Sequence, residues 1–368
     1  MIKNEKINSF FLSTLVVALS GAPFWGILTS FMIHTSSTAS LISMVIGFVF
    51  SMLLSFIFLK FFDSYPELFG AEKVKKGFGK FSYIMNALFG IIGLLVYISL
   101  SYRLAMFLSS QYLTRTSNIY IYALVIFITS YIASKKMETL TRVSVISFFL
   151  AIIIFLFDFF NLLTDIKLDN FLPFITVSTK SIITSSFYFT LYFTVPIFFV
   201  MGYRKNNLVD KEKFKKQFYF MLTLSFVILF LAIGTTIGVY GIKLTDLFDY
   251  PLYTVLKRIR IFSFLESLEN ISSIIWALYT INAGSIMLCT IFDNFKVAYN
   301  LDNIKSKILN GIMVVIAFIF PLILYKNNNY IETYGYVKFP LIITIILLIL
   351  IIISTFVISI KYKKNKEN

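Results

Sequence analysis

The chain has 368 residues, of which 58% are hydrophobic and only 14% are charged, and its mean hydropathy is +0.84. A typical soluble domain has about 25% charged residues, so this composition excludes a water-soluble globule, a disordered chain and a secreted disulfide scaffold. The single cysteine, Cys289, excludes an internal disulfide, and the single histidine, His34, excludes a multi-histidine zinc site. We therefore expect an all-α polytopic membrane protein without a cofactor or a metal.

The apolar segments predict ten transmembrane helices. A helix needs about 20 apolar residues to cross roughly 30 Å of hydrocarbon. The segments that satisfy this condition are 9–33, 39–62, 81–109, 118–134, 143–161, 181–202, 217–240, 270–292, 308–325 and 339–360. The first of them has no small-residue cleavage site at a suitable distance, so we expect it to stay in the membrane as a span.

The basic residues predict the orientation of these spans. With the N-terminus in the cytoplasm, the inner segments contain 23 of the 33 Lys and Arg residues and the outer segments 9. This bias follows the positive-inside rule and predicts that both termini are cytoplasmic. Because the basic residues are spread over every inner loop, the charge of +15 indicates no nucleic-acid partner.

Ten spans divide into two halves of five, and an odd number places the halves in opposite orientations. This arithmetic is that of an inverted repeat, in which spans one and six meet at the bilayer midplane. We expect one integral membrane domain over 1–368, with repeat one at about 9–161 and repeat two at about 171–360.

Two spans contain residues that interrupt helices. The first has Ser20-Gly21-Ala22-Pro23 at its middle, where a broken helix would expose amides suited to a carboxylate. A plain proline kink is the alternative. The sixth has Thr190, Thr194 and Pro196. The two threonine hydroxyls could bond carbonyls that the proline frees, or they could serve only in packing.

Charged residues inside spans are costly and usually face a cavity or a partner. Arg103 in span three could hold a substrate carboxylate, brace the span against Glu269 or a carbonyl, or extend toward the outer surface. Asp158 lies near the outer end of span five, where we expect an interfacial position.

The outer segment between spans seven and eight predicts an amphipathic helix that lies on the outer surface or caps a vestibule. Apolar residues recur at helical spacing from Leu252, beside a basic face that includes Lys257 and Arg260. Glu266 and Glu269 share one helix face, which fits either acid–base chemistry or acids at a helix start.

Short motifs in a matching order resemble those of the B subunits of spore germination nutrient receptors, a branch of the amino acid, polyamine and organocation transporter superfamily. The motifs are Gly21-Ala22, Tyr65-Pro66-Glu67-Leu68-Phe69, Gly77-Phe78-Gly79-Lys80, Arg103 with Ala105-Met106, Met137-Glu138-Thr139-Leu140-Thr141-Arg142, Leu172-Pro173, Tyr250-Pro251 to Trp276, and Tyr334-Gly335-Tyr336. The chain departs from the pattern at Ser267, where Arg is common, and in span six, which lacks the usual Gly or Glu.

The resemblance implies a leucine-transporter-type fold in which helices 1 and 6 are discontinuous around a central site. It implies a small nutrient ligand, typically an amino acid, a larger membrane A-type subunit, a lipoprotein C-type subunit and a place in the spore inner membrane. The residues that we expect to bind the nutrient are Ser20, Gly21, Ala22, Pro23, Phe24, Arg103, Tyr188, Thr190 and Trp276.

Two other functions remain open at this point. An ion-coupled amino acid permease would have the same fold, and the absence of an evident buried acid in spans one, six or eight weakens proton coupling. A membrane enzyme for lipid-linked sugars would need long outer loops, which the chain lacks. We expect a receptor subunit that is not an enzyme.

Overall fold

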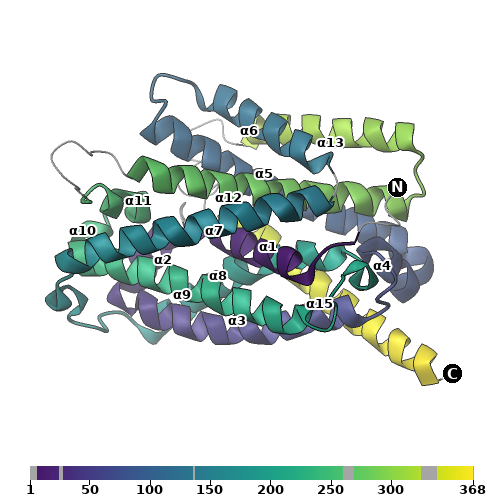
Figure 1. Cartoon of the computed structure of the whole chain (residues 1–368), viewed down its shortest axis with the longest axis horizontal. Helices are drawn as coiled ribbons and strands as arrows, with labels where there is room; N and C mark the ends of the chain where they lie inside the picture. The colour runs from purple at the N-terminus through teal and green to yellow at the C-terminus, as the bar shows by residue number, and fades with distance from the viewer. Residues whose placement is uncertain (1–5, 25–27, 136, 260–268, 325–337, 368) are drawn as a thin grey trace.

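Long helices lie side by side in one bundle in the computed structural model of the chain (Figure 1). The structure describes all residues except 1–5, 25–27, 136, 260–268, 325–337 and 368. Both chain termini lie at the same end of the bundle, which we call the terminal end. The opposite end, where α10 (Ile242–Thr245) and α11 (Pro251–Leu256) lie, is called the distal end.

Ten spans can be traced, as predicted. Among the described residues, eight helical segments are long and apolar enough to cross a membrane, and two shorter apolar helices complete the set. In chain order the spans are α1 (Ser9–Gly21) with α2 (Thr29–Ser36), α3 (Ser40–Asp63), α5 (Ser82–Gln111), α6 (Asn118–Ala133), α7 (Met137–Leu162), α8 (Thr179–Thr194) with the 3-10 helix η7 (Val195–Gly202), α9 (Phe214–Tyr240), α12 (Glu269–Ala298), α13 (Asn303–Leu324) and α15 (Phe339–Glu367).

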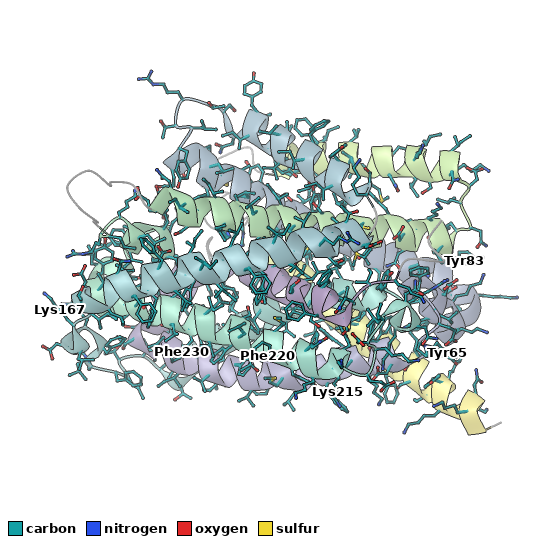
Figure 2. The ribbon with its side chains drawn as sticks, in the orientation of Figure 1. Tyr65, Tyr83, Lys167, Lys215, Phe220 and Phe230 are labelled. Atoms are coloured by element: carbon teal, nitrogen blue, oxygen red, sulfur yellow. The ribbon has the colours of Figure 1, made fainter. Side chains whose placement is uncertain are left out.

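The outer faces of these helices carry large apolar side chains. Phe127 and Ile153, for example, are 69% and 64% exposed. Figure 2 shows Phe220 and Phe230 between Lys215, toward the terminal end, and Lys167 at the distal end. Apolar side chains between two charged ends are what a bilayer stabilises, so the chain is an integral membrane protein.

The helix packing has the symmetry of an inverted repeat. Span one packs against span seven (α1 on α9), and span six packs against span two (α8 on α3). Likewise span five packs against span eight (α7 on α12), and span ten against span three (α15 on α5). In both cases, the second contact follows from the first when five is added to span numbers one to five and subtracted from span numbers six to ten. Two five-helix halves related as an inverted repeat require this relation.

The structure differs from the sequence predictions at several helix ends. Span five begins at Met137 rather than 143, because Glu138 and Arg142 form an i,i+4 ion pair of 2.6 Å that extends the helix beyond its apolar part. The short helix α4 (Gly70–Phe78), which precedes span three, was not predicted. Its Lys73 is buried and donates to the carbonyls of Phe61 and Phe62. These carbonyls lie in the last turn of α3, where they have no partner in their own helix.

Glycine permits close packing between α5 and α12. A Cβ added to Gly90 would lie 2.1 Å from Cε2 of Phe295. We expect Gly90→Ala to lower stability by about 1–3 kcal/mol through overpacking, measured as a lower thermal midpoint in detergent. Gly234→Ala is the matched control, because nothing lies within 4 Å of its added Cβ. Equal midpoints for the two variants would contradict this packing.

Candidate functional site

The first span is broken near the middle of the bundle. Helix α1 ends at Gly21, and the Ala22 amide still donates to the Ala18 carbonyl at 3.0 Å. The Ala22 carbonyl accepts a 2.9 Å hydrogen bond from the indole N–H of Trp276 in α12. Backbone groups freed by a broken helix need such partners at membrane depth, so α12 helps to hold the break open.

Span six changes its helical form at the position that proline predicts. Helix α8 ends at Thr194 and continues as η7, with Pro196 in the first turn of the 3-10 helix. Proline is tolerated there because a first-turn amide needs no partner in the helix. Spans one and six are therefore both discontinuous, as predicted.

A small central cavity lies beside both discontinuities. Its volume is about 30 Å³, which is comparable to the volume of one or two water molecules. Spans one, three, six, eight and ten contribute its lining, which consists of Pro23, Val96, Ser99, Leu100, Arg103, Tyr192, Pro196, Met287, Pro340 and Thr344.

Arg103 is the charged group of this cavity. It is only 7% exposed, and its guanidinium carbon lies 5.7 Å from the centre of the Tyr192 ring. A guanidinium over an aromatic face is attracted by the ring quadrupole and presents a planar fork that fits a carboxylate. The cavity therefore presents a group that suits a carboxylate, although its present volume is that of water molecules.

The predicted binding residues do not all meet in this cavity. Pro23 and Arg103 line it, whereas Gly21 and Trp276 line a second cavity on the other side of the break. The other five make contacts within the protein. Three form hydrogen bonds: the Ser20 hydroxyl with that of Ser225, the Ala22 carbonyl with Trp276, and the Thr190 hydroxyl with the Gly47 carbonyl. Two pack through their rings: Phe24 on Phe189 and Phe193, and Tyr188 on Phe31.

Sequence reasoning did not place Tyr192 or Thr344 in the site. Tyr192 lies one turn from Pro196 on the same helix face, which is a signal that the sequence contains. Thr344 offers no such signal, because span ten is a nearly uniform apolar run in which no face stands out.

Aromatic side chains cover the distal side of the site. The Phe107 ring packs edge-on against the rings of Tyr250, Tyr253 and Trp276. Tyr253 belongs to α11, which is six residues long and mostly buried, so this helix fits the predicted cap better than the predicted surface position. The predicted basic residue Arg260 and the acid Glu266 lie outside the described residues.

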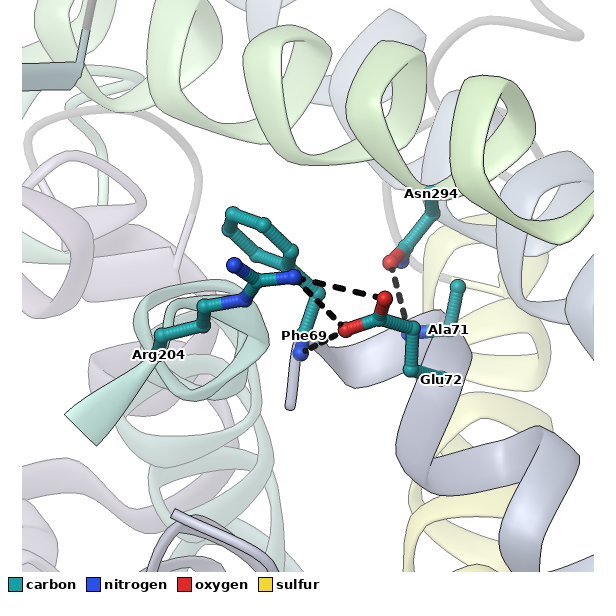
Figure 3. A network of polar contacts seen from close by, with 5 residues as sticks. All are labelled: Phe69, Ala71, Glu72, Arg204 and Asn294. Carbon is teal, nitrogen blue, oxygen red and sulfur yellow. Dashed lines mark hydrogen bonds and ion pairs between the residues drawn. The ribbon is translucent and has the colours of Figure 1, made fainter. Parts of the chain in front are cut away.

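A polar network lies on the terminal side of the site (Figure 3). The Arg204 guanidinium donates to both carboxylate oxygens of Glu72, at 3.0 and 3.3 Å, and lies 3.9 Å from the centre of the Phe69 ring. Glu72 also accepts from the Phe69 amide, and Asn294 of α12 accepts from the Ala71 amide. This network joins α4 to spans six and eight, and we call it the terminal clasp.

Comparison with known proteins identifies the family. Residues 6–331 match the family described as spore germination protein. The chain belongs to the spore germination protein family. A relative named "Putative spore germination protein YfkT", from Bacillus subtilis (strain 168), is 27% identical over 256 residues, which cover 68% of this chain and 67% of the relative.

Solved structures similar to this spore germination family member show its fold. The manganese transporter of Eremococcus coleocola has a TM-score of 0.61 and 12% identity, covering 97% of this chain and 79% of the transporter. A Na⁺-coupled sialic acid symporter in a substrate-bound outward-open state has a TM-score of 0.62 and 11% identity, covering 96% and 80%. The predicted leucine-transporter-type fold is thus confirmed. Within the described ranges, no group of three His, Cys, Asp or Glu side chains could hold a metal.

Proposed function

We propose that this spore germination family member is the membrane subunit of a nutrient germinant receptor, and that it binds a small nutrient in the central cavity. The observation that carries the proposal is the buried guanidinium of Arg103, which faces a cavity at the two helix discontinuities. A free amino acid is the nutrient class that fits best, because it supplies the carboxylate that this guanidinium would pair with.

The nutrient carboxylate binds to Arg103 in this proposal rather than mainly to amides of the first span. We expected amides near Gly21, Ala22 and Phe24 to hold it. The Ala22 amide, however, is bonded to the Ala18 carbonyl. A carboxylate ligand would accept a charge-assisted hydrogen bond from the buried Arg103 guanidinium, and such bonds are stronger than those between neutral groups.

The size of the cavity implies a conformational change. A space of about 30 Å³ accommodates water but no amino acid. The aromatic cluster around Phe107 covers it on the distal side, and the terminal clasp lies on the other side. Nutrient binding would therefore favour a wider state of the bundle, and the difference in affinity between the two states provides the signal.

The proposed setting follows from the family and the charge pattern. A larger membrane A-type subunit and a lipoprotein C-type subunit are the expected partners, and the spore inner membrane is the expected location. Both termini lie at one end of the bundle, and the loops at that end contain the excess of basic residues. Together these two observations support a cytoplasmic location of the terminal end. The protein would act by binding and not as an enzyme.

An ion-coupled amino acid permease is the second candidate. The manganese transporter and the sialic acid symporter have this fold, which supports a transport mechanism without specifying a substrate. Uptake of radiolabelled amino acids into proteoliposomes that contain the full chain would detect such a flux.

Spores that lack this chain test the receptor proposal. We expect them to lose release of dipicolinate in response to one amino acid of a panel, and to respond normally to the others. The reason is that only the response to the nutrient bound in this cavity depends on this chain. Complementation with the wild-type chain should restore the response. An unchanged germination response to every amino acid of the panel, together with uptake of labelled amino acids, would contradict the receptor proposal and support the permease.

A further inference from the structure

A second cavity lies on the opposite side of the first-span break, between α1, α7, α9 and α12. Its volume is about 70 Å³. The lining is mostly apolar and consists of Val17, Gly21, Ala151, Ile154, Phe155, Asp158, Ser225, Ile228, Leu229, Ala232, Ser272, Ile275, Trp276 and Tyr279. Asp158, which the sequence places near the outer end of span five, thus faces a space inside the bundle.

Asp158 is a buried carboxyl without a cationic partner. It is 8% exposed, and it is the only buried acidic side chain in the part of the chain that the structure describes. The Ser272 hydroxyl donates to its Oδ2 atom. No ion pair joins Asp158 to any described Lys, Arg or His side chain. An ionised carboxylate in such a place costs several kcal/mol unless a positive charge compensates it.

The oxygens around the cavity are too few for a hard metal cation. Besides the Asp158 carboxylate, the side-chain oxygens of the lining residues are the hydroxyls of Ser225, Ser272 and Tyr279, and the Ser225 hydroxyl is already bonded to that of Ser20 at 2.6 Å. Ions such as Ca²⁺ and Mg²⁺ take six or more oxygen ligands, whereas a proton needs one carboxylate. The lining therefore favours a proton.

We propose that Asp158 is a proton-binding site. Hydronium that enters from the distal end gives its proton to the carboxylate, which becomes a neutral carboxyl while water leaves, and the reverse step releases the proton. The neutral form keeps the hydrogen bond with Ser272 and stabilises the contact of α7 with α12, whereas the charged form draws water into the cavity and separates the two helices.

Trp276 connects this site to the central cavity. Its ring lines the proton site, and its indole N–H donates to the carbonyl of Ala22, the residue before Pro23 in the central cavity. A shift of α12 on protonation therefore moves the break of the first span. This consequence for nutrient binding rests on the proposed function, but the proton site itself does not.

Among the residues that the structure describes, few other titratable groups lie near the site. Helix α1 contains none, and only Tyr279 lines the cavity with Asp158. The groups on the packed elements are Glu269 one turn before Ser272, Tyr240 at the distal end of α9, and the Asp165–Arg258 ion pair of 3.5 Å beyond α7.

The fluorescence of Trp276 gives a test that needs no nutrient. The chain has two tryptophans, so Trp25→Phe leaves Trp276 as the only emitter. We expect its emission in the full chain, reconstituted in nanodiscs, to titrate over a series from acidic to mildly alkaline pH. Asp158→Asn should abolish this titration. The matched control Asp165→Asn, which changes a carboxylate in a distal ion pair, should retain it.

A second variant guards against misfolding of Asp158→Asn. Ser272→Ala keeps the carboxyl but removes its hydrogen-bond donor, and it should move the midpoint to higher pH because the charged form loses that donor. Titration that persists unchanged in both variants would overturn the proposal. So would the absence of any titration in the parent chain, or an emission change that follows Na⁺ at constant pH instead of protons.

Discussion

Replacing Arg103 with alanine is expected to abolish or strongly weaken the germination response. In the proposed complex the guanidinium donates to the nutrient carboxylate inside a buried cavity. Loss of a hydrogen bond to a charged group costs about 1.5–3 kcal/mol. This corresponds to an increase of about ten- to hundredfold in the nutrient concentration that gives half-maximal release of dipicolinate.

Arg103→Lys separates charge from geometry in this experiment. Lysine keeps the positive charge but loses the planar fork and its stacking on the Tyr192 ring, so we expect an intermediate response. Arg115→Ala is the matched control, because that arginine is exposed after the end of α5. If Arg103→Ala reaches the membrane in normal amount and responds like the wild type, the nutrient does not bind at this guanidinium.

The break in the first span could be predicted because its causes are local. Gly21 and Pro23 weaken or interrupt a helix wherever they occur, and α1 ends at Gly21 as expected. The change of form near Pro196 has the same local origin. The ten spans could also be predicted, because the thickness of the hydrocarbon sets one length for all of them.

The partners of the site residues could not be predicted, because they depend on packing between the two halves. Arg103 meets Tyr192 only when spans three and six are adjacent. Asp158 lies a few residues from a helix end, and a hydropathy profile cannot show that this helix face is turned toward α1 and α12. The role of Trp276 as donor to Ala22 also depends on this arrangement.

The terminal clasp shows the same limit from another direction. Its helix α4 has nine residues, too few to stand out as a span, and its stability comes from contacts with distant segments. Glu72 and Arg204 are ordinary loop charges in the sequence. Only the fold shows that they tie α4 to the end of span six, and that the Gly70 and Gly202 backbones approach closely beneath them.

Removal of Glu72 is expected to open the terminal end of the bundle. Glu72→Ala leaves the Arg204 guanidinium without its carboxylate, and the pair is only partly exposed, at 14% for the Arg204 and 32% for the Glu72 side chain. The natural cysteine reports the change, because Cys289 is buried and lines a small pocket with Phe69 beside the clasp. A loss of about 1 kcal/mol should make Cys289 react about fivefold faster with a membrane-permeant maleimide.

Further variants identify the cause of that faster reaction. Glu72→Gln retains an acceptor for the Phe69 amide but has no charge, so it should lie between the wild type and Glu72→Ala if the ion pair contributes. Asp165→Ala removes the partly exposed ion pair with Arg258, away from the terminal end, and should leave the Cys289 rate unchanged. Equal rates in the wild type and Glu72→Ala would mean that apolar packing alone closes this end. A faster rate in Glu72→Ala that Arg204→Ala reproduces, and that the double variant does not increase further, would show that the two residues act as one clasp.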